Sequence, residues 1–184
     1  MIAYVIPNRN GSYDQARKIG ASIAYQCVDD PIGHNDGGTT HLEHVSFGTY
    51  INSFKGYNSI FNDSTIKINS IKICHVSYLN ILNGAPLNGY YIRSFFYING
   101  NFYYSPLITN PMSDYQYFEY TWNKSPTTNQ NWDPSIINNL EFGIVLSTNN
   151  SSQKGGAFCT QIYLEIAYNE SDLTNGFFLL NPSI

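Results

Sequence analysis

The chain has 184 residues, a formal net charge of −4, 12% charged residues and 16% aromatic residues. Its length suits one domain, and its apolar and aromatic content is too high for a disordered chain. The nine Lys and Arg residues are scattered, unlike the clusters typical of nucleic-acid-binding surfaces. No stretch approaches the about 20 apolar residues of a membrane helix. We therefore expect neither nucleic acid nor membrane among the partners.

The beginning of the chain is predicted to form an N-terminal arm over residues 1–21, with a candidate short helix over 13–19. It lacks a basic segment followed by an apolar stretch, so we expect no signal peptide. A single β-sandwich domain is predicted over 22–184, with a C-terminal tail from about residue 169.

Alternating apolar and polar residues predict strands over most of that domain, at 22–30, 40–51, 65–79, 141–147 and 157–168. Within 65–79 the alternation changes phase between Ile68 and Ile71, which indicates a bulge or a break. The pair Asn99-Gly100, flanked by aromatic alternation, predicts a hairpin with a tight turn.

Two further features complete the prediction of an all-β sandwich. Asp133-Pro134 is typical of an N-cap followed by a first-turn proline, so we expect one short helical turn that ends near Leu140. The three cysteines, Cys27, Cys74 and Cys159, lie in apolar surroundings without metal-ligand spacing and are predicted to be buried free thiols.

The order of these features resembles a known group of proteins. The residues that carry the resemblance are Tyr25–Asp30, Asp36–Thr40, Ile66–Tyr78, the aromatic hairpin, Trp132, Leu140–Gly143 and Thr160–Tyr168. Together they resemble the jelly-roll β-sandwich structural proteins of phages and viruses, of the capsid decoration, head-fibre or tail-associated type. The resemblance covers roughly 22–168 and implies a jelly-roll-like antiparallel sandwich at the virion surface, with no catalytic residues to carry over. The aromatic residue usual after Thr-Thr is replaced here by His41.

The polar stretch 28–44 is the candidate metal site, because it contains three of the four histidines and several carboxylates. His41 and His44 lie three apart on a predicted strand and would point to opposite faces, which argues against a transition metal. Oxygen donors from Asp29, Asp30 and Asp36 are a candidate calcium site. The favoured interpretation is that Asp36 builds its own turn through a side-chain hydrogen bond.

No motif of an enzyme nucleophile or a phosphate-binding loop is present, so we expect no catalytic residues and no cofactor other than the candidate calcium ion. Carbohydrate binding is a stronger candidate, because aromatic rings and amides match the two chemical faces of a sugar. The candidate ligand-binding residues are Tyr120, Trp122, Asn123 and Trp132, with Asn129 and Asn131 nearby. The competing interpretation places the aromatic residues in the core.

Assembly is the third expectation, because the surface is poor in charge and rich in Tyr and Asn, as protein interfaces are. The residues predicted to make subunit contacts are Ile2, Tyr4, Val5, Phe177, Phe178, Leu179 and Leu180. The leading functional hypothesis is a non-enzymatic virion structural protein that forms a homo-oligomer, with a trimer as a candidate, and contacts other virion proteins. The alternative is a lectin-like domain that binds host or other glycans.

Overall fold

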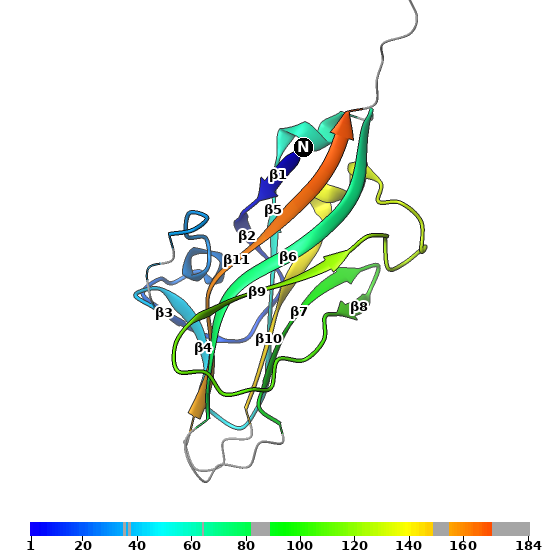
Figure 1. Cartoon of the computed structure of the whole chain (residues 1–184). Helices are drawn as coiled ribbons and strands as arrows, with labels where there is room; N and C mark the ends of the chain where they lie inside the picture. Colours follow the sequence, from blue (N-terminus) through cyan, green and yellow to red (C-terminus); the bar gives the residue numbers. More distant parts are fainter. Residues whose placement is uncertain (35, 37, 64, 82–88, 149–154, 171–184) are drawn as a thin grey trace, which may run out of the picture.

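The computed structural model describes residues 1–34, 36, 38–63, 65–81, 89–148 and 155–170, which form two packed antiparallel sheets (Figure 1). The six-stranded sheet has the order β3 (Arg17–Ile19), β4 (His41–His44), β11 (Gly155–Glu170), β6 (Ile66–Ile81) and β9 (Gln116–Trp122), and β1 (Ile2–Val5) also pairs with β11. The five-stranded sheet has the order β2 (Pro7–Asp14), β5 (Gly48–Gly56), β10 (Glu141–Thr148), β7 (Tyr91–Ile98) and β8 (Asn101–Tyr104). The predicted all-β, jelly-roll-like sandwich is confirmed.

Three short 3-10 turns connect strands within the described residues: η1 (Ala24–Cys27), η2 (Ser59–Asn62) and η3 (Pro134–Asn139). The turn η3 is the predicted one, and the side chain of Asp133 caps it as expected by accepting a hydrogen bond from the backbone N–H of Ser135 at 2.9 Å. The two others were not predicted. No helix of the described residues is long and apolar enough to cross a membrane.

The core lies between the sheets and is built by alternate residues of the facing strands. Its main contributors are Ile71, Ile73, Ile162, Leu164 and Ile166 from one sheet and Ile92, Phe96, Phe142, Ile144 and Leu146 from the other. Because successive side chains of a strand point to opposite faces, these rows reproduce the alternation in the sequence. All three cysteines are free and buried, as predicted.

The long pair β6–β11 contains two irregularities in its register. Ala167 pairs with Ser70 but Tyr168 pairs with Ile68, which leaves an extra residue on β6 and confirms the bulge predicted from the change of phase. The second irregularity leaves Thr160 as the extra residue on β11, and this bulge directs the Thr160 hydroxyl to the turn before β4.

The first 21 residues do not form a separate arm. Residues 2–19 supply β1, β2 and β3, which pair with β11, β5 and β4 and therefore belong to both sheets. The candidate helix over 13–19 is absent: this stretch contains the end of β2 and all of β3. Pairing with β4 and β5 satisfies the backbone here, so tertiary contacts override a weak local helix signal.

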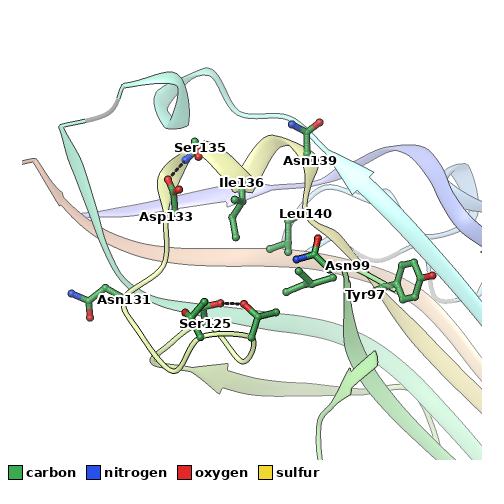
Figure 2. A pocket seen from close by; sticks show the side chains of 12 residues that line it. Tyr97, Asn99, Ser125, Asn131, Asp133, Ser135, Ile136, Asn139 and Leu140 are labelled. Carbon is green, nitrogen blue, oxygen red and sulfur yellow. Dashed lines mark hydrogen bonds between the residues drawn. The ribbon is translucent and has the colours of Figure 1, made fainter. Parts of the chain in front are cut away.

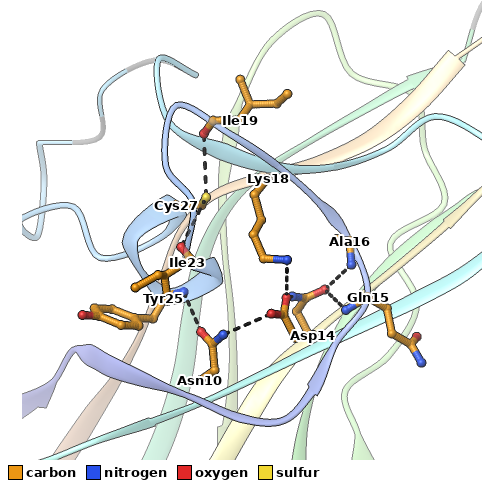
Figure 3. A network of polar contacts seen from close by, with 10 residues as sticks. Asn10, Asp14, Gln15, Ala16, Lys18, Ile19, Ile23, Tyr25 and Cys27 are labelled. Atoms are coloured by element: carbon orange, nitrogen blue, oxygen red, sulfur yellow. Dashed lines mark hydrogen bonds and ion pairs between the residues drawn. The ribbon is translucent and has the colours of Figure 1, made fainter.

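The strand predicted over 22–30 is also wrong, because η1 occupies its centre. Ala24 and Cys27 are buried, a three-residue spacing that matches one turn of 3-10 helix. Figure 3 shows the polar contacts that hold this turn: the side chain of Asn10 accepts a hydrogen bond from the backbone N–H of Tyr25 at 2.9 Å. A side chain from β2 thus fixes a conformation that alternation alone does not reveal.

The loop between β2 and β3 belongs to the same network (Figure 3). Lys18 forms an ion pair of 2.8 Å with Asp14. The amide oxygen of Asn52, a buried residue of β5, accepts hydrogen bonds from the backbone N–H groups of Gln15 and Ala16 at 3.3 and 2.7 Å. The network therefore has a structural role, since it satisfies backbone groups of the loop between β2 and β3 and ties this loop to β5.

Candidate functional site

The turn that precedes β4 is built by Asp36. Its carboxylate accepts hydrogen bonds from the backbone N–H groups of Gly38 and Thr40, at 3.2 and 2.8 Å, and from the Thr40 hydroxyl at 2.6 Å. The Thr160 hydroxyl donates a fourth hydrogen bond at 3.2 Å. Burial opposes ionisation of this carboxyl group, but the hydrogen bonds from Thr40, Gly38 and Thr160 outweigh burial and lower its pKa.

The neighbouring carboxylates are less well provided with donors. Asp30 accepts a hydrogen bond from the backbone N–H of Asp36 at 2.9 Å, and burial raises the pKa of both Asp29 and Asp30. In the described part of the chain, no group of three or more His, Cys, Asp or Glu residues is arranged to hold a metal ion. The turn-building role expected for Asp36 is present, and calcium binding by Asp29, Asp30 and Asp36 stays a prediction.

The substitution Asp36→Ala is expected to lower the free energy of unfolding by about 1–3 kcal/mol, because it leaves several donors without their acceptor. Asp36→Asn keeps one acceptor oxygen and should lose less. Urea denaturation measures both changes, and melting with and without EDTA tests calcium. A variant within about 0.5 kcal/mol of the wild type would show that the turn does not depend on Asp36.

The histidines of β4 have separate structural partners. A ring nitrogen of His41 lies 2.7 Å from the backbone oxygen of Gly38, and one of His44 lies 2.8 Å from that of Gly48. The His44 ring also packs on Tyr50, with 3.9 Å between ring centroids. Each histidine ring thus connects its own loop to β4.

Trp132 is not available to a ligand, and its predicted sugar-binding role is wrong. Its side chain is 3% exposed, and its indole N–H donates to the backbone oxygen of Trp122 at 3.0 Å. The Phe96 ring packs edge-on against both indoles, at 4.7 Å from Trp122 and 5.3 Å from Trp132. Inward orientation and a satisfied indole N–H make Trp132 a core residue, as the competing interpretation expects.

The other candidate ligand residues of this region differ in exposure and do not line a common pocket. Trp122 is partly buried under its contact with Phe96, while Tyr120 is 38% exposed and meets Trp122 edge-on at 4.5 Å. Asn123 is exposed and lines none of the pockets described below. The four residues therefore do not form one site.

The predicted assembly residues fall into three groups: exposed residues, a buried residue and residues outside the described part of the chain. Ile2 and Tyr4 are exposed on the outer face of β1, at 55% and 42%. Val5 is buried in the protein's own core, so its predicted role in subunit contacts is wrong: alternation along β1 turns it inward. Phe177, Phe178, Leu179 and Leu180 lie outside the described residues.

A pocket of about 430 Å³ opens at the end of the sandwich near the turn between β7 and β8. Three segments form it: the end of the β7–β8 hairpin, the loop that follows β9, and η3 (Figure 2). Its lining residues are Tyr97, Ile98, Asn99, Ser125, Thr127, Thr128, Asn131, Asp133, Ser135, Ile136, Asn139 and Leu140. Side chains from the five-stranded sheet, from the loop after β9 and from η3 thus meet at one place.

The loop after β9 holds its shape through its own hydrogen bonds. The backbone N–H of Ser125 donates to Gln130 at 2.8 Å, and that of Asn129 donates back to Ser125 at 2.9 Å. Asn129 has a φ of 57°, a left-handed conformation that asparagine tolerates better than most residues. The buried Trp132 anchors the end of this loop, so the loop holds the polar side chains of Ser125 and Asn131 in fixed positions at the pocket.

The polar lining of the pocket is almost entirely neutral. The side chains of Asn99, Asn131 and Asn139 are exposed, and none of them makes a hydrogen bond to another described residue. The one carboxylate, Asp133, caps η3 (Figure 2), and neither Lys nor Arg lines the pocket. Unpaired amides above aliphatic side chains such as Ile136 can bind an uncharged ligand rich in hydroxyl groups.

Comparison with known proteins gives distant likenesses of fold. No family model and no curated protein sequence matches the chain. Among solved structures, a family 16 carbohydrate-binding module shares 11% identity, covers 83% of this chain and 86% of that chain, and has a TM-score of 0.43. A family 29 carbohydrate-binding module from Piromyces equi shares 10% identity over 89% and 90%, with a TM-score of 0.42. A cyclase from Fischerella sp. shares 10% identity over 90% and 82%, also with a TM-score of 0.42. At these TM-scores the likenesses carry no functional argument.

Sequence reasoning found one side of the pocket and missed the other. Asn131 was a candidate because it follows an aromatic strand, and Asp133 was predicted as the cap of η3. Asn99 was interpreted only as a turn residue, and Asn139 had no signal of its own beyond its place at the end of the predicted turn. The hairpin and η3 are about 40 residues apart in sequence, and the pairing of β10 with β7, in which Glu141 lies opposite Tyr97, brings Asn99 and Asn139 to the same end of the five-stranded sheet.

His75, in the centre of β6, is expected to make the fold sensitive to mild acid. Burial lowers its pKa to about 3, whereas an exposed histidine has a pKa of about 6.5. Below pH 6.5 the unfolded chain binds a proton that the folded chain does not bind until near pH 3. The contribution of neutral His75 is therefore fully present above pH 6.5 and decreases as the pH falls, by about 1.4 kcal/mol between pH 7.5 and 5.5.

Urea denaturation at these two pH values measures the loss. His75→Asn should reduce it, because the titrating group is gone, while His34→Asn removes an exposed histidine and should leave it unchanged. Burial also lowers the pKa of His44, which adds a smaller loss of the same sign. An unchanged pH dependence in His75→Asn would contradict the assignment.

Proposed function

We propose that this chain is a non-enzymatic carbohydrate-binding β-sandwich and that the pocket between the β7–β8 turn, the loop after β9 and η3 holds the sugar. The observation that supports it best is the neutral, hydroxyl- and amide-rich lining of that pocket over an aliphatic floor. The lectin-like function is the alternative hypothesis from the sequence, but the proposed site consists of other residues than the predicted tryptophans.

The chemistry of the lining fits a sugar. Each sugar hydroxyl both donates and accepts hydrogen bonds, and so does each asparagine amide, through its NH₂ group and its oxygen. The C–H faces of a sugar ring are apolar and suit side chains such as Ile98, Ile136 and Leu140, which also line the pocket. A phosphate or carboxylate ligand would instead favour Arg or Lys, and the lining contains neither.

The same lining supports binding without hydrolysis. Glycoside hydrolysis ordinarily uses two carboxylates that flank the scissile bond. The pocket has one, Asp133, whose oxygen is committed to the N–H of Ser135. A second pocket of about 330 Å³ on the other side of η3 shares Asp133, Ser135 and Asn139 with the first and has no further carboxylate in its lining. A longer glycan could extend along η3 between the two pockets.

The test is titration calorimetry of the full chain against oligosaccharides chosen from a glycan array. Asn131→Ala and Asn139→Ala are each expected to weaken binding about 3- to 10-fold, the effect of losing one or two hydrogen bonds. Asn123→Ala is the matched control: it removes an exposed amide from the same region but not from the pocket, and should leave the affinity unchanged.

Two results would overturn this proposal. One is the absence of any glycan that binds at millimolar concentration. The other is a glycan whose affinity falls in Tyr120→Ala but not in Asn131→Ala or Asn139→Ala, which would move the site to the edge strand β9.

The virion structural role stays a second proposal, favoured by the exposed apolar side chains of β1. Among the described strands β1 pairs only with β11, so its other edge lacks a strand partner, and there the Asn58 side chain donates to the backbone oxygen of Tyr4 at 2.9 Å. Ile2 and Tyr4 are exposed beside this edge. Light scattering of the wild type and of Ile2→Lys tests this: an oligomer that becomes smaller in the variant supports subunit contact through β1, and a wild-type monomer contradicts it.

A further inference from the structure

A second, smaller cavity lies between the two sheets where β9 forms an edge. Its volume is about 120 Å³. His75 of β6, Ser94 of β7, and Phe118 and Tyr120 of β9 line it, together with residues 105–108 of the segment after β8. It shares no lining residue with the pocket proposed for carbohydrate.

The cavity exists because both inner rows of side chains are interrupted by polar residues. On β7, Ser94 stands between Ile92 and Phe96, which point into the core. On β6, His75 follows Ile71 and Ile73 in the same way. A serine is smaller than the aliphatic residues of its row, so it leaves space between the sheets, and that space has a polar wall.

The Ser94 hydroxyl is the unusual group in this wall. Ser94 is 1% exposed, and its Oγ has no hydrogen-bond partner among the residues that the structure describes. The neighbouring Ser105 hydroxyl is already used: it accepts from the backbone N–H of Ser94 at 3.0 Å and donates to the oxygen of Pro106 at 3.2 Å. Buried hydroxyl groups are nearly always paired, so Ser94 Oγ is a hydrogen-bonding position that a ligand can satisfy.

The other walls are rings and aliphatic groups held in place. A ring nitrogen of His75 lies 2.8 Å from the Ser77 hydroxyl, and the His75 ring stacks on Phe118 with 5.5 Å between centroids. Tyr120 and Leu107 are both partly exposed, so the cavity opens to solvent beside them.

The charge of the site favours an uncharged occupant. Glu119, the only carboxylate in the lining, is already bound by Lys72 at 3.1 Å and by the Tyr117 hydroxyl at 2.8 Å. No Lys or Arg lines the cavity to balance an anion. Its volume is close to the about 150 Å³ of an apolar protein cavity known to accept benzene, which indicates one small ring.

We propose that this cavity binds an uncharged single-ring compound with one hydroxyl group, which pairs with Ser94 Oγ while the ring lies against Phe118 and Tyr120. The hydroxyl of such a compound can donate to or accept from Ser94. The site is independent of the carbohydrate proposal, since the two pockets have no residue in common.

The test uses the ¹⁵N-labelled full chain, with phenol, benzene and benzoate as probes in NMR titrations. Phenol is expected to saturate shifts of residues around Ser94 with a Kd on the order of 1 mM. Benzene should bind at least threefold more weakly because it leaves Ser94 Oγ unpaired, and benzoate should not bind because its charge would lose its hydration.

Ser94→Ala removes the hydroxyl and should abolish the preference for phenol over benzene. Ser46→Ala, which removes an exposed hydroxyl between β4 and β5, should keep it. The proposal is overturned if phenol and benzene bind the wild type with equal affinity, or if neither compound binds at about 10 mM. It is also overturned if Ser94→Ala still prefers phenol over benzene. None of these outcomes depends on whether the larger pocket binds a glycan.

Discussion

Replacing Trp132 by alanine is expected to lower the free energy of unfolding by about 3–5 kcal/mol, the usual cost of deleting a large buried aromatic side chain. Trp132 is 3% exposed, packs against Phe96 and donates its indole N–H to Trp122. The substitution leaves a cavity at the end of the sandwich and an acceptor without its donor. It also removes the anchor of the loop that carries Ser125 and Asn131, so glycan binding should decrease together with stability.

Matched variants separate these contributions. Trp132→Phe keeps most of the apolar contact and loses the indole hydrogen bond, so it should lower the free energy of unfolding by less than Trp132→Ala does. Tyr120→Ala removes an aromatic ring from the same region that is 38% exposed, and should cost much less. Urea or guanidinium denaturation measures all three variants. A Trp132→Ala protein as stable as the wild type, with weakened glycan binding, would restore the ligand role predicted from the sequence.

The second large effect is expected at Glu141, whose carboxylate is 4% exposed at the start of β10. It accepts hydrogen bonds from the backbone N–H of Ser12 at 2.6 Å, from the Ser12 hydroxyl at 3.0 Å and from the Ser53 hydroxyl. Lys55 lies 3.7 Å away and balances its charge. Glu141→Ala should lower the free energy of unfolding by about 3–5 kcal/mol, because it leaves three hydrogen-bond donors without an acceptor and removes the partner of the partly exposed Lys55.

This carboxylate links β2 to β10 across the five-stranded sheet, so its loss should destabilise β2 first. Hydrogen exchange should show faster exchange at Ser12 and Tyr13 in Glu141→Gln, which keeps the shape but not the charge. Glu170→Ala, at an exposed position at the end of β11, is the control and should stay within about 0.5 kcal/mol of the wild type. Equal stability of the Glu141→Ala and Glu170→Ala variants would contradict the structural role of Glu141.

These two residues show why binding and stability can be separated in this protein. The groups that support the loop and the strands are buried, whereas the side chains of Asn99, Asn131 and Asn139 are exposed and make no hydrogen bond to another described residue. Substitution of an exposed asparagine would remove one of the proposed ligand contacts without opening the core. The glycan test can therefore use folded variants, and the buried positions serve as its stability controls.

The hairpin, the capped turn and the bulge in β6 could be predicted because each depends on neighbouring residues. Asn99 and Gly100 both adopt positive φ, at 51° and 81°, which is the backbone geometry that this pair favours. Asp133 caps η3 through a residue two positions away. The change of apolar phase around Asn69 appears directly in the register of β6 with β11.

The failed predictions share a different cause. Ala24–Cys27 alternates like a strand but forms η1, because Asn10 of β2 binds its backbone. The strand predicted over 40–51 is interrupted after His44, and Val45 and Phe47 are exposed where β4 ends and the chain turns toward β5. Residues far away in sequence contact the backbone in both places: Asn10 binds Tyr25 in the first, and the Thr148 hydroxyl donates to the backbone oxygen of Ser46 in the second.

The sequence by itself determined that this chain is an all-β sandwich with a capped helical turn, free buried thiols and a turn built by Asp36. Each of these features depends on local hydrogen bonds or on the alternation of apolar and polar residues, and both involve residues that are close together in sequence. Only the tertiary structure decided that Trp132 is core, that Asn99, Asn131 and Asn139 share one pocket, and that His75 and Ser94 face one cavity. The physical reason is that a binding surface depends on which strands pack together and on which side chains keep unpaired polar groups after packing, and neither property is local to any segment.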